Sequence, residues 1–119
     1  GVPEFIDFMM TDRPELQVPI RGGLRWLDAE AGLRHGRAFK DLAEVERTAL
    51  LDDIAYPVRA KPEFSHGVAF FSRFRDLVAT GFFTSKMGID DLKYIGNVPN
   101  PMWDGCPNEC YTHLGVTKA

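Results

Sequence analysis

The chain has 119 residues, of which 45% are hydrophobic and 26% charged, and its formal net charge is −3. This length and composition predict one folded domain over residues 1–119 and exclude a disordered tract. A mildly acidic chain lacks the broad basic patch that binds nucleic acid, so we expect no nucleic-acid partner. No apolar run approaches the ~20 residues of a membrane span, so we expect no transmembrane segment.

Two features of the composition are unusual. Nine of the fourteen aromatic residues are Phe, and the last quarter of the chain is rich in Gly and Pro. A chain this short buries only about two thirds of its unfolded surface. So many Phe residues in so small a core suggest that part of the surface is buried against another protein.

The first half of the chain reads as two helices. Pro3, at a favoured first-turn position, opens a predicted helix that continues to Met10. A second helix, kinked at Pro19 and weakened by Gly22 and Gly23, is predicted to start near Pro14. Its apolar residues recur every three or four positions: Leu16, Ile20, Leu24, Leu27 and Ala31. Gly32 and Gly36 lie near its expected end.

Two further helices follow. Asp41 is the predicted N-cap of the third helix, with Glu44 completing a capping box. The fourth is predicted from Pro62 or Glu63 to about Thr80, where Gly81 ends it. The expected apolar stripe of the third helix comprises Leu42, Val45, Ala49, Leu50 and Ile54.

After Gly81 the sequence no longer shows a long helical repeat of apolar residues. A short helix is predicted from Ile89 to Tyr94, and one last turn from Asn108 to Leu114. Between them Pro and Gly are too dense for regular structure. The predicted fold is therefore all-α: a small irregular bundle of about four to five helices, with a helical body over 1–80 and an extended Gly/Pro-rich, partner-wrapping tail over 81–119.

We find no catalytic constellation in the sequence. There is no glycine-rich phosphate loop, no His-Glu-x-x-His and no Gly-x-Ser-x-Gly. The paired acids at 52–53 and 90–91 are adjacent, so on a helix they diverge by ~100° and are expected to be solvated. We therefore predict no catalytic and no cofactor-binding residues in this chain.

The two cysteines form the most pointed local motif, Cys106-Pro-Asn-Glu-Cys110. Its spacing differs from the Cys-x-x-Cys-His of covalent haem attachment. A local disulfide, in an oxidising compartment, and two free thiols are both consistent with it. With His113 the pair offers three zinc ligands but no fourth. A small stand-alone helical metal-binding module, built on these three residues, is therefore kept as the alternative function, and a helical structural protein without a partner as a further one.

An ordered set of short motifs along the chain resembles subunit 3, the small or gamma subunit, of bacterial gluconate 2-dehydrogenase-type complexes. The motifs are Gly-Val-Pro-Glu-Phe-Ile-Asp-Phe at 1–8, Arg-Gly-Gly-Leu-Arg-Trp-Leu-Asp at 21–28, Gly-Phe-Phe-Thr-Ser at 81–85, Tyr-Ile-Gly-Asn at 94–97 and Gly-Cys-Pro at 105–107. The stretches at 97–101 and 105–110 are similar to members that pair with glucoside 3-dehydrogenase-like flavoproteins.

The resemblance implies a non-catalytic small subunit. In such complexes the large subunit is a flavoprotein of the glucose-methanol-choline type that holds FAD and oxidises a sugar or sugar acid. Electrons usually leave through a separate cytochrome c subunit or another acceptor. The small subunit typically carries a twin-arginine leader and helps the flavoprotein to mature and reach the periplasm, so a periplasmic location is expected.

The surplus of Phe and the resemblance together predict a partner interface built on aromatic side chains. These are Phe70, Phe71, Phe82, Phe83, Tyr94 and Trp103. Trp103 has two interpretations of equal weight, an anchor in the partner or a loop tryptophan folded back over the bundle.

Overall fold

The computed structural model describes residues 1–99, 101–102 and 105–117, and within those ranges it contains helices and no strands. The α-helices are α1 (Val2–Asp12), α2 (Gln17–His35), α3 (Glu44–Ala55), α4 (Ser65–Phe83), α5 (Lys86–Asp91) and α6 (Asn108–Leu114). Single 3-10 turns, η1 (Pro14–Leu16), η2 (Phe39–Asp41) and η3 (Pro62–Phe64), precede α2, α3 and α4. The all-α prediction is confirmed.

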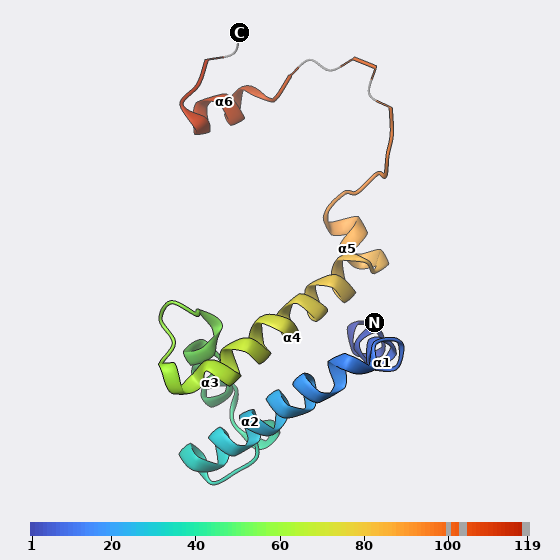
Figure 1. Cartoon of the computed structure of the whole chain (residues 1–119). Coiled ribbons are helices and arrows are strands. Elements are labelled where there is room, and N and C mark those ends of the chain that lie inside the picture. Colours follow the sequence, from blue (N-terminus) through green and yellow to red (C-terminus); the bar gives the residue numbers. More distant parts are fainter. Residues whose placement is uncertain (100, 103–104, 118–119) are drawn as a thin grey trace.

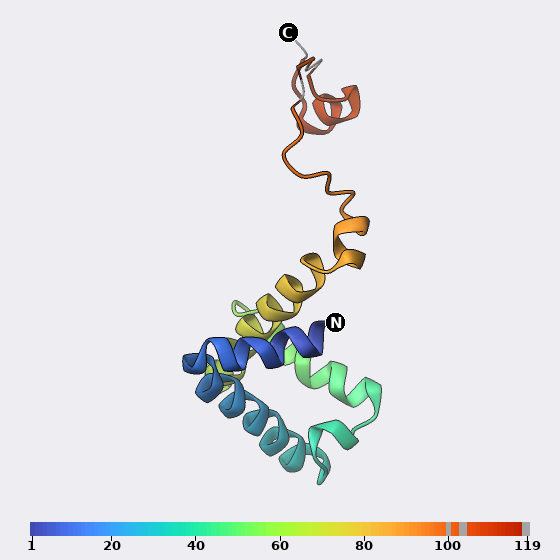
Figure 2. The same cartoon turned by 90° about the vertical axis from the view of Figure 1, so that its right-hand side faces the viewer.

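Helix α4 is the central element, because α1, α2, α3 and α5 all pack against it. Helices α2 and α4 lie side by side (Figure 1). Trp26 contacts Gly67, and Gly23 contacts Phe70. Residue numbers therefore rise along α4 as they fall along α2, so the two helices are antiparallel. Helix α1 packs against α4 with Phe5 on Gly81, near the C-terminal end of α4, while α3 packs near the other end (Figures 1 and 2). We call α1 to α4, residues 2–83, the body.

Three glycines allow these close helix contacts, because each accepts an aromatic ring against the helix backbone. A Cβ on Gly23 would overlap the ring of Phe70. A Cβ on Gly67 would lie 2.6 Å from the Trp26 ring, and one on Gly81 would lie 2.7 Å from Cδ1 of Phe5. We call these three contacts the glycine sockets.

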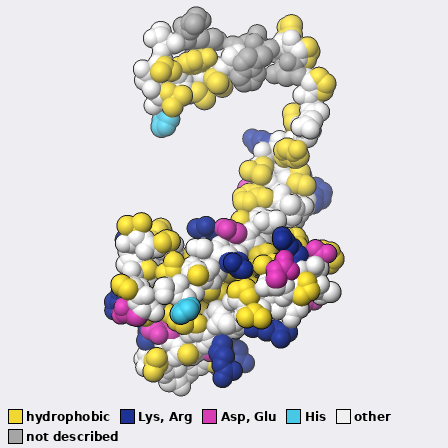
Figure 3. Space-filling view, in the orientation of Figure 1, with side chains coloured by type: hydrophobic (Ala, Val, Ile, Leu, Met, Phe, Trp, Pro, Cys, Tyr) yellow, Lys and Arg dark blue, Asp and Glu magenta, His cyan; other side chains and the backbone are white. Residues whose placement is uncertain are grey.

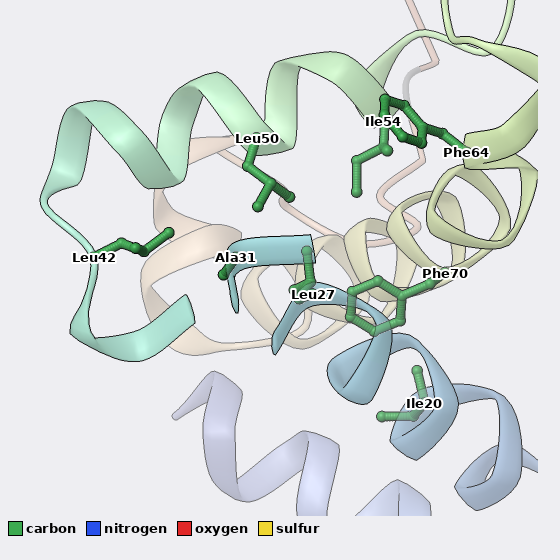
Figure 4. Close-up of a cluster of buried hydrophobic side chains, with 8 residues drawn as sticks. All are labelled: Ile20, Leu27, Ala31, Leu42, Leu50, Ile54, Phe64 and Phe70. Atoms are coloured by element: carbon green, nitrogen blue, oxygen red, sulfur yellow. The ribbon is translucent and has the colours of Figure 1, made fainter. Parts of the chain in front are cut away.

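The core of the body lies between α2, α3 and α4 (Figure 4). Leu50 and Ile54 of α3 are its largest fully buried side chains. Burying a side chain of this kind contributes about 1.5–3 kcal/mol to the free energy of folding. The other buried hydrophobic residues are Ile20, Leu27, Ala31, Leu42, Phe64 and Phe70.

Two details of the helices differ from the sequence prediction, and one agrees with it. Helix α2 is continuous through Gly22 and Gly23, and Pro19 is its third residue, where a backbone N–H has no intrahelical partner in any case. Gly81 does not end α4: it lies inside the helix, buried against Phe5, and α4 continues to Phe83. Gly36, in the left-handed conformation at φ 67°, ends α2 as expected.

The start and the apolar stripe of α3 also differ. Its N-cap is Ala43 instead of Asp41, because Glu46, not Glu44, accepts the Ala43 N–H at 2.8 Å. Val45 and Ala49, predicted in the buried stripe, are exposed. The buried side of α3 is set by Leu50 and Ile54 one turn later.

The described residues after α4, 84–99, 101–102 and 105–117, project from the body, and we call them the projecting segment (Figures 1 and 2). The chain measures 60 × 36 × 26 Å and has a radius of gyration of 20.1 Å. A compact domain of this length has a radius of gyration of about 13–14 Å. The difference arises because the chain beyond α5 leaves the body instead of folding back on it.

Candidate partner-binding surface

The projecting segment begins at a tight junction between α4 and α5. The Ser85 hydroxyl donates to the Phe82 carbonyl at 2.6 Å and accepts the Gly88 N–H at 3.2 Å, which caps α5. Gly88 lies directly on the backbone of Phe82 and Phe83, where a Cβ would overlap it. The end of α4 and the start of α5 are therefore held together by backbone contact.

Helix α5 ends in a Schellman motif that turns the chain outward. The Tyr94 N–H donates to the Ile89 carbonyl at 3.0 Å, and the Lys93 N–H donates to the Asp90 carbonyl at 3.1 Å. Lys93 sits in the left-handed region at φ 52°, where glycine is usual. The chain from Tyr94 onward starts from this turn.

Apolar side chains of the projecting segment are exposed to solvent. Ten of the eighteen exposed large hydrophobic residues in the described part of the chain lie between Phe83 and Val116, and no described residue after Gly88 is buried. Only three of the 26 residues from Leu92 to Thr117 are Asp, Glu, Lys or Arg. Figure 3 shows hydrophobic side chains along this segment, whereas charged side chains gather on the body. Exposed apolar side chains gathered on one segment make it a candidate surface for binding another protein.

The predicted interface aromatics divide between core and surface. Phe70 is only 6% exposed, and its ring centroid lies 5.4 Å from that of Phe74. It also occupies the Gly23 socket, so Phe70 is a core residue in this fold. Phe71 is half-buried against the same core. Phe70 is therefore not part of the exposed surface, and Phe71 contributes little to it.

The remaining predicted aromatics lie at or beyond the α4–α5 junction. Phe82 and Phe83 pack edge to face, with ring centroids 5.0 Å apart, and Phe83 is 43% exposed. Tyr94 is 63% exposed. Trp103 lies outside the residues that the structure describes.

Sequence reasoning missed the aliphatic part of this surface. The exposed residues there that are not aromatic include Met87, Ile89, Leu92, Ile95, Val98 and Met102. The sequence did contain an indication of this surface. A stretch too rich in Gly and Pro for regular structure forms no helix, so its apolar residues cannot be buried as one face of a helix.

The cysteine motif lies at the start of α6. Cys106 and Cys110 are both free and exposed, and the Cys110 N–H donates to the Pro107 carbonyl at 3.0 Å. His113 is in the last turn of the same helix. In the described part of the chain, no three His, Cys, Asp or Glu side chains come together as a metal site, these three included.

Charged side chains of the body tie α2 to α3. The Arg34 guanidinium donates to Asp53 at 2.6 Å and to Glu30 at 2.7 Å, and the bond to Asp53 is the main reason that the pKa of Arg34 is raised. Its guanidinium carbon also lies 5.3 Å from the centroid of the Phe64 ring. These contacts join the ends of α2 and α3. They do not form a pair of carboxylates that face one bound substrate.

Glu46 makes the second link between α2 and α3. Its carboxylate accepts the Ala43 N–H and the Arg37 guanidinium at 3.0 Å, and lies 3.3 Å from His35 Nδ1. The pKa of Glu46 is lowered, first by the Ala43 hydrogen bond and then by Arg37 and His35, although partial desolvation opposes the shift. These contacts stabilise the N-terminal cap of α3, which accounts for the position of Glu46.

The described helices include none with the length and apolar character needed to cross a bilayer. Comparison with known proteins identifies the chain through its first 105 residues, which match the family model of gluconate 2-dehydrogenase subunit 3. The chain belongs to this family. Comparisons with curated proteins and with solved structures gave no match.

The family assignment confirms the resemblance seen in the sequence. It identifies the chain as an accessory subunit of a dehydrogenase complex, with a larger subunit as its partner. The matched region contains the body, α5 and most of the extended chain that follows. It ends at residue 105, so Cys106 and Cys110 lie beyond it.

Proposed function

We propose that the chain is the non-catalytic small subunit of a periplasmic, FAD-dependent dehydrogenase of the glucose-methanol-choline type that oxidises a sugar or sugar acid. Its role is to support the assembly, stability and export of the flavoprotein subunit. The observation that carries this proposal is the projecting segment, whose apolar side chains contact so little of the chain's own body.

The physical argument concerns where this apolar surface goes. Removing apolar surface from water contributes about 25 cal/mol per Å², so an exposed, weakly charged segment gains free energy when a partner covers it. Obligate interfaces commonly exceed about 2,000 Å² and resemble a divided core. A segment that leaves the body, exposing apolar side chains from Met87 to Val116, suits such an interface.

In this proposal the chemistry belongs to the partner. The larger subunit holds FAD and oxidises the substrate, and a cytochrome c or another acceptor takes the electrons. The small subunit contributes binding surface. We extend the proposal to the members that accompany glucoside 3-dehydrogenase-like flavoproteins, on the sequence similarity at 97–101 and 105–110.

The test is co-expression with a candidate flavoprotein large subunit of a gluconate 2-dehydrogenase-type complex. We expect a complex that elutes as one peak, carries flavin absorbance and oxidises sugars with an artificial acceptor. The triple substitution Tyr94→Ala, Ile95→Ala and Val98→Ala should reduce the yield of complex strongly, because all three side chains are exposed in the projecting segment.

The body provides a matched control. Val45 and Val58 are 74% and 99% exposed, so Val45→Ala together with Val58→Ala removes exposed apolar surface without touching the projecting segment. We expect full complex yield from this variant. Equal yields from both variants, or no complex from the unmodified chain, would contradict the proposal.

The proposed periplasmic location adds a chemical consequence for the cysteines. We propose that Cys106 and Cys110, free here and four residues apart, form a local disulfide in an oxidising compartment. Thiol titration of protein purified from the periplasm, before and after reduction, should show two thiols that appear only on reduction. Stoichiometric zinc on the purified chain would instead support the metal-binding alternative.

A further inference from the structure

A groove runs along one side of α4, away from the projecting segment. It consists of two hollows of about 330 and 520 Å³, one between α2 and α4 and the other between α1, η1 and α4. Ala69 and Arg73 of α4 line both, so the two hollows form one continuous surface. This groove is long enough to follow several turns of α4, from His66 to Thr80.

Gly22 lines the α2 wall of this groove, and no contact within the described part of the chain requires a glycine there. A Cβ at Gly22 would meet no atom within 4 Å, whereas its neighbour Gly23 must be glycine to accept Phe70. Gly22 lies inside α2, where glycine is less favourable than alanine. The missing side chain therefore costs helix stability, and the fold gains no contact in return.

The charge of the groove indicates what would occupy it. Arg73 forms no ion pair with any described residue, although it lines both hollows. Asp76, at the α1 end, already pairs with Arg75 at 3.1 Å. Arg13, which also lines the groove, pairs with Glu15 at 3.0 Å, so of the Arg and Asp side chains that line it only Arg73 is without an ion-pair partner in the described part of the chain.

We infer that this groove binds a segment of the larger dehydrogenase subunit that contains an Asp or Glu residue. The backbone of that segment approaches α2 closely at Gly22, and its acidic side chain pairs with Arg73. The inference rests on the proposed function and deepens it, because it adds a second attachment site on the body. Charge complementarity favours this occupant. A second copy of the chain, bound symmetrically through this groove, would bring two unpaired Arg73 side chains into one interface without supplying an acidic partner from the groove itself.

The steric test uses two glycines of the same helix. Gly22 and Gly32 both lie in α2, both have open space around the Cβ position, and only Gly22 lines the groove. We expect Gly22→Leu to raise the dissociation constant for the larger subunit by at least about tenfold, because leucine fills the path of the bound segment. Gly32→Leu should leave the dissociation constant unchanged. Both free chains should melt at or above the temperature of the unmodified chain, since leucine favours a helix more than glycine does.

The electrostatic test uses Arg73→Glu, with Lys40→Glu as the control for the same change in net charge on an exposed residue of η2. We expect Arg73→Glu to weaken binding about tenfold at low salt, and this loss should shrink as NaCl is raised. Lys40→Glu should change the affinity by less than about twofold.

The outcomes separate this inference from the proposed function. An unmodified chain that binds the larger subunit, with Gly22→Leu and Arg73→Glu binding equally well, would overturn the groove and leave the proposed function standing. Equal losses in Gly22→Leu and Gly32→Leu would also overturn it. An unmodified chain that does not bind at all would overturn both.

Discussion

The body and the projecting segment use apolar residues in opposite ways. Every residue of the buried hydrophobic core lies between Ile20 and Phe70, whereas no described residue after Gly88 is buried. Both parts are helical at the start, and both contain aromatic and aliphatic side chains. The buried contacts that stabilise this chain therefore lie in the body, and the projecting segment adds few of them.

The aromatic residues illustrate the difference. In the body, Phe5, Phe70 and Trp26 occupy the glycine sockets, and Phe64 packs edge to face on Trp26 with centroids 5.7 Å apart. Much of the unusual Phe content is therefore explained by contacts within the chain. From Phe83 onward, the exposed large hydrophobic side chains are mainly aliphatic, together with Phe83 and Tyr94.

Shortening the chain should give the largest effect and separates the two parts directly. A chain that ends at Tyr94 retains the body, α5 and its Schellman motif but loses most exposed apolar residues of the projecting segment. We expect no complex with the larger subunit after size-exclusion chromatography. The melting temperature should change by less than about 2 °C, because no buried contact is lost. A large drop in melting temperature would show that the segment also stabilises the body.

A pair of isoleucine substitutions compares the two parts at one residue each. Ile54 is fully buried and Ile95 is exposed. Ile54→Ala should lower the free energy of unfolding by about 2–5 kcal/mol, because it removes buried methyl groups and leaves a cavity. Ile95→Ala should change it by less than about 0.5 kcal/mol. Urea unfolding followed by circular dichroism measures both, and similar losses would contradict the division.

The helical body was largely predictable because its apolar residues recur with the helical period. The stripe of α2 was placed correctly at Ile20, Leu27 and Ala31. Periodicity could not tell how the broad apolar face of α4 divides between core and surface, since neighbouring helices decide this. Phe70 is buried for that reason, although the sequence favoured it as a partner contact.

Glycine was the least predictable residue type. Gly81 and Gly36 look alike in sequence, yet Gly36 ends a helix and Gly81 accepts Phe5 inside one. The deciding factor is the residue that crosses from another helix, which lies 76 positions away for Gly81. The exposed surface after Gly81 followed the same pattern. The irregular chain there was predictable from its Gly and Pro content, but the exposure of its aliphatic side chains depended on whether the chain folds back. Whether this surface binds a partner stays a prediction.

Acid should weaken the α2–α3 link of the body without affecting the projecting segment. The folded-state pKa of Glu46 is lowered from its ordinary value of 4.5, so its contribution to stability is present above that value and is lost as the pH falls through the lower folded-state pKa. Between about pH 5.5 and about pH 3 the unmodified chain should therefore lose more stability than Glu46→Gln, which has no carboxylate to protonate. Thermal melts at a series of pH values measure this, and parallel curves would exclude the effect.

The smallest expected effect concerns the turn at which the projecting segment leaves α5. Lys93 has a positive φ of 52°, so Lys93→Gly should relieve backbone strain and strengthen the end of α5 by up to about 1 kcal/mol. Slower amide exchange at Tyr94, whose N–H donates to Ile89, measures the change. Lys93→Ala is the control, because it removes the charge and keeps the strain. Equal exchange rates in the two variants would argue against strain at this residue.

The backbone contact of Gly88 with Phe82 and Phe83 fixes the direction in which the chain leaves the body. A segment attached through a free hinge would lose orientational freedom when it reaches a partner, and binding would be weaker by that entropy. Here α4 and α5 meet at an angle set by the fold, with Ser85 bonded to both. The junction thus limits the orientations that the projecting segment can adopt relative to the body before binding. It would also transmit force between the body and a protein bound to the segment.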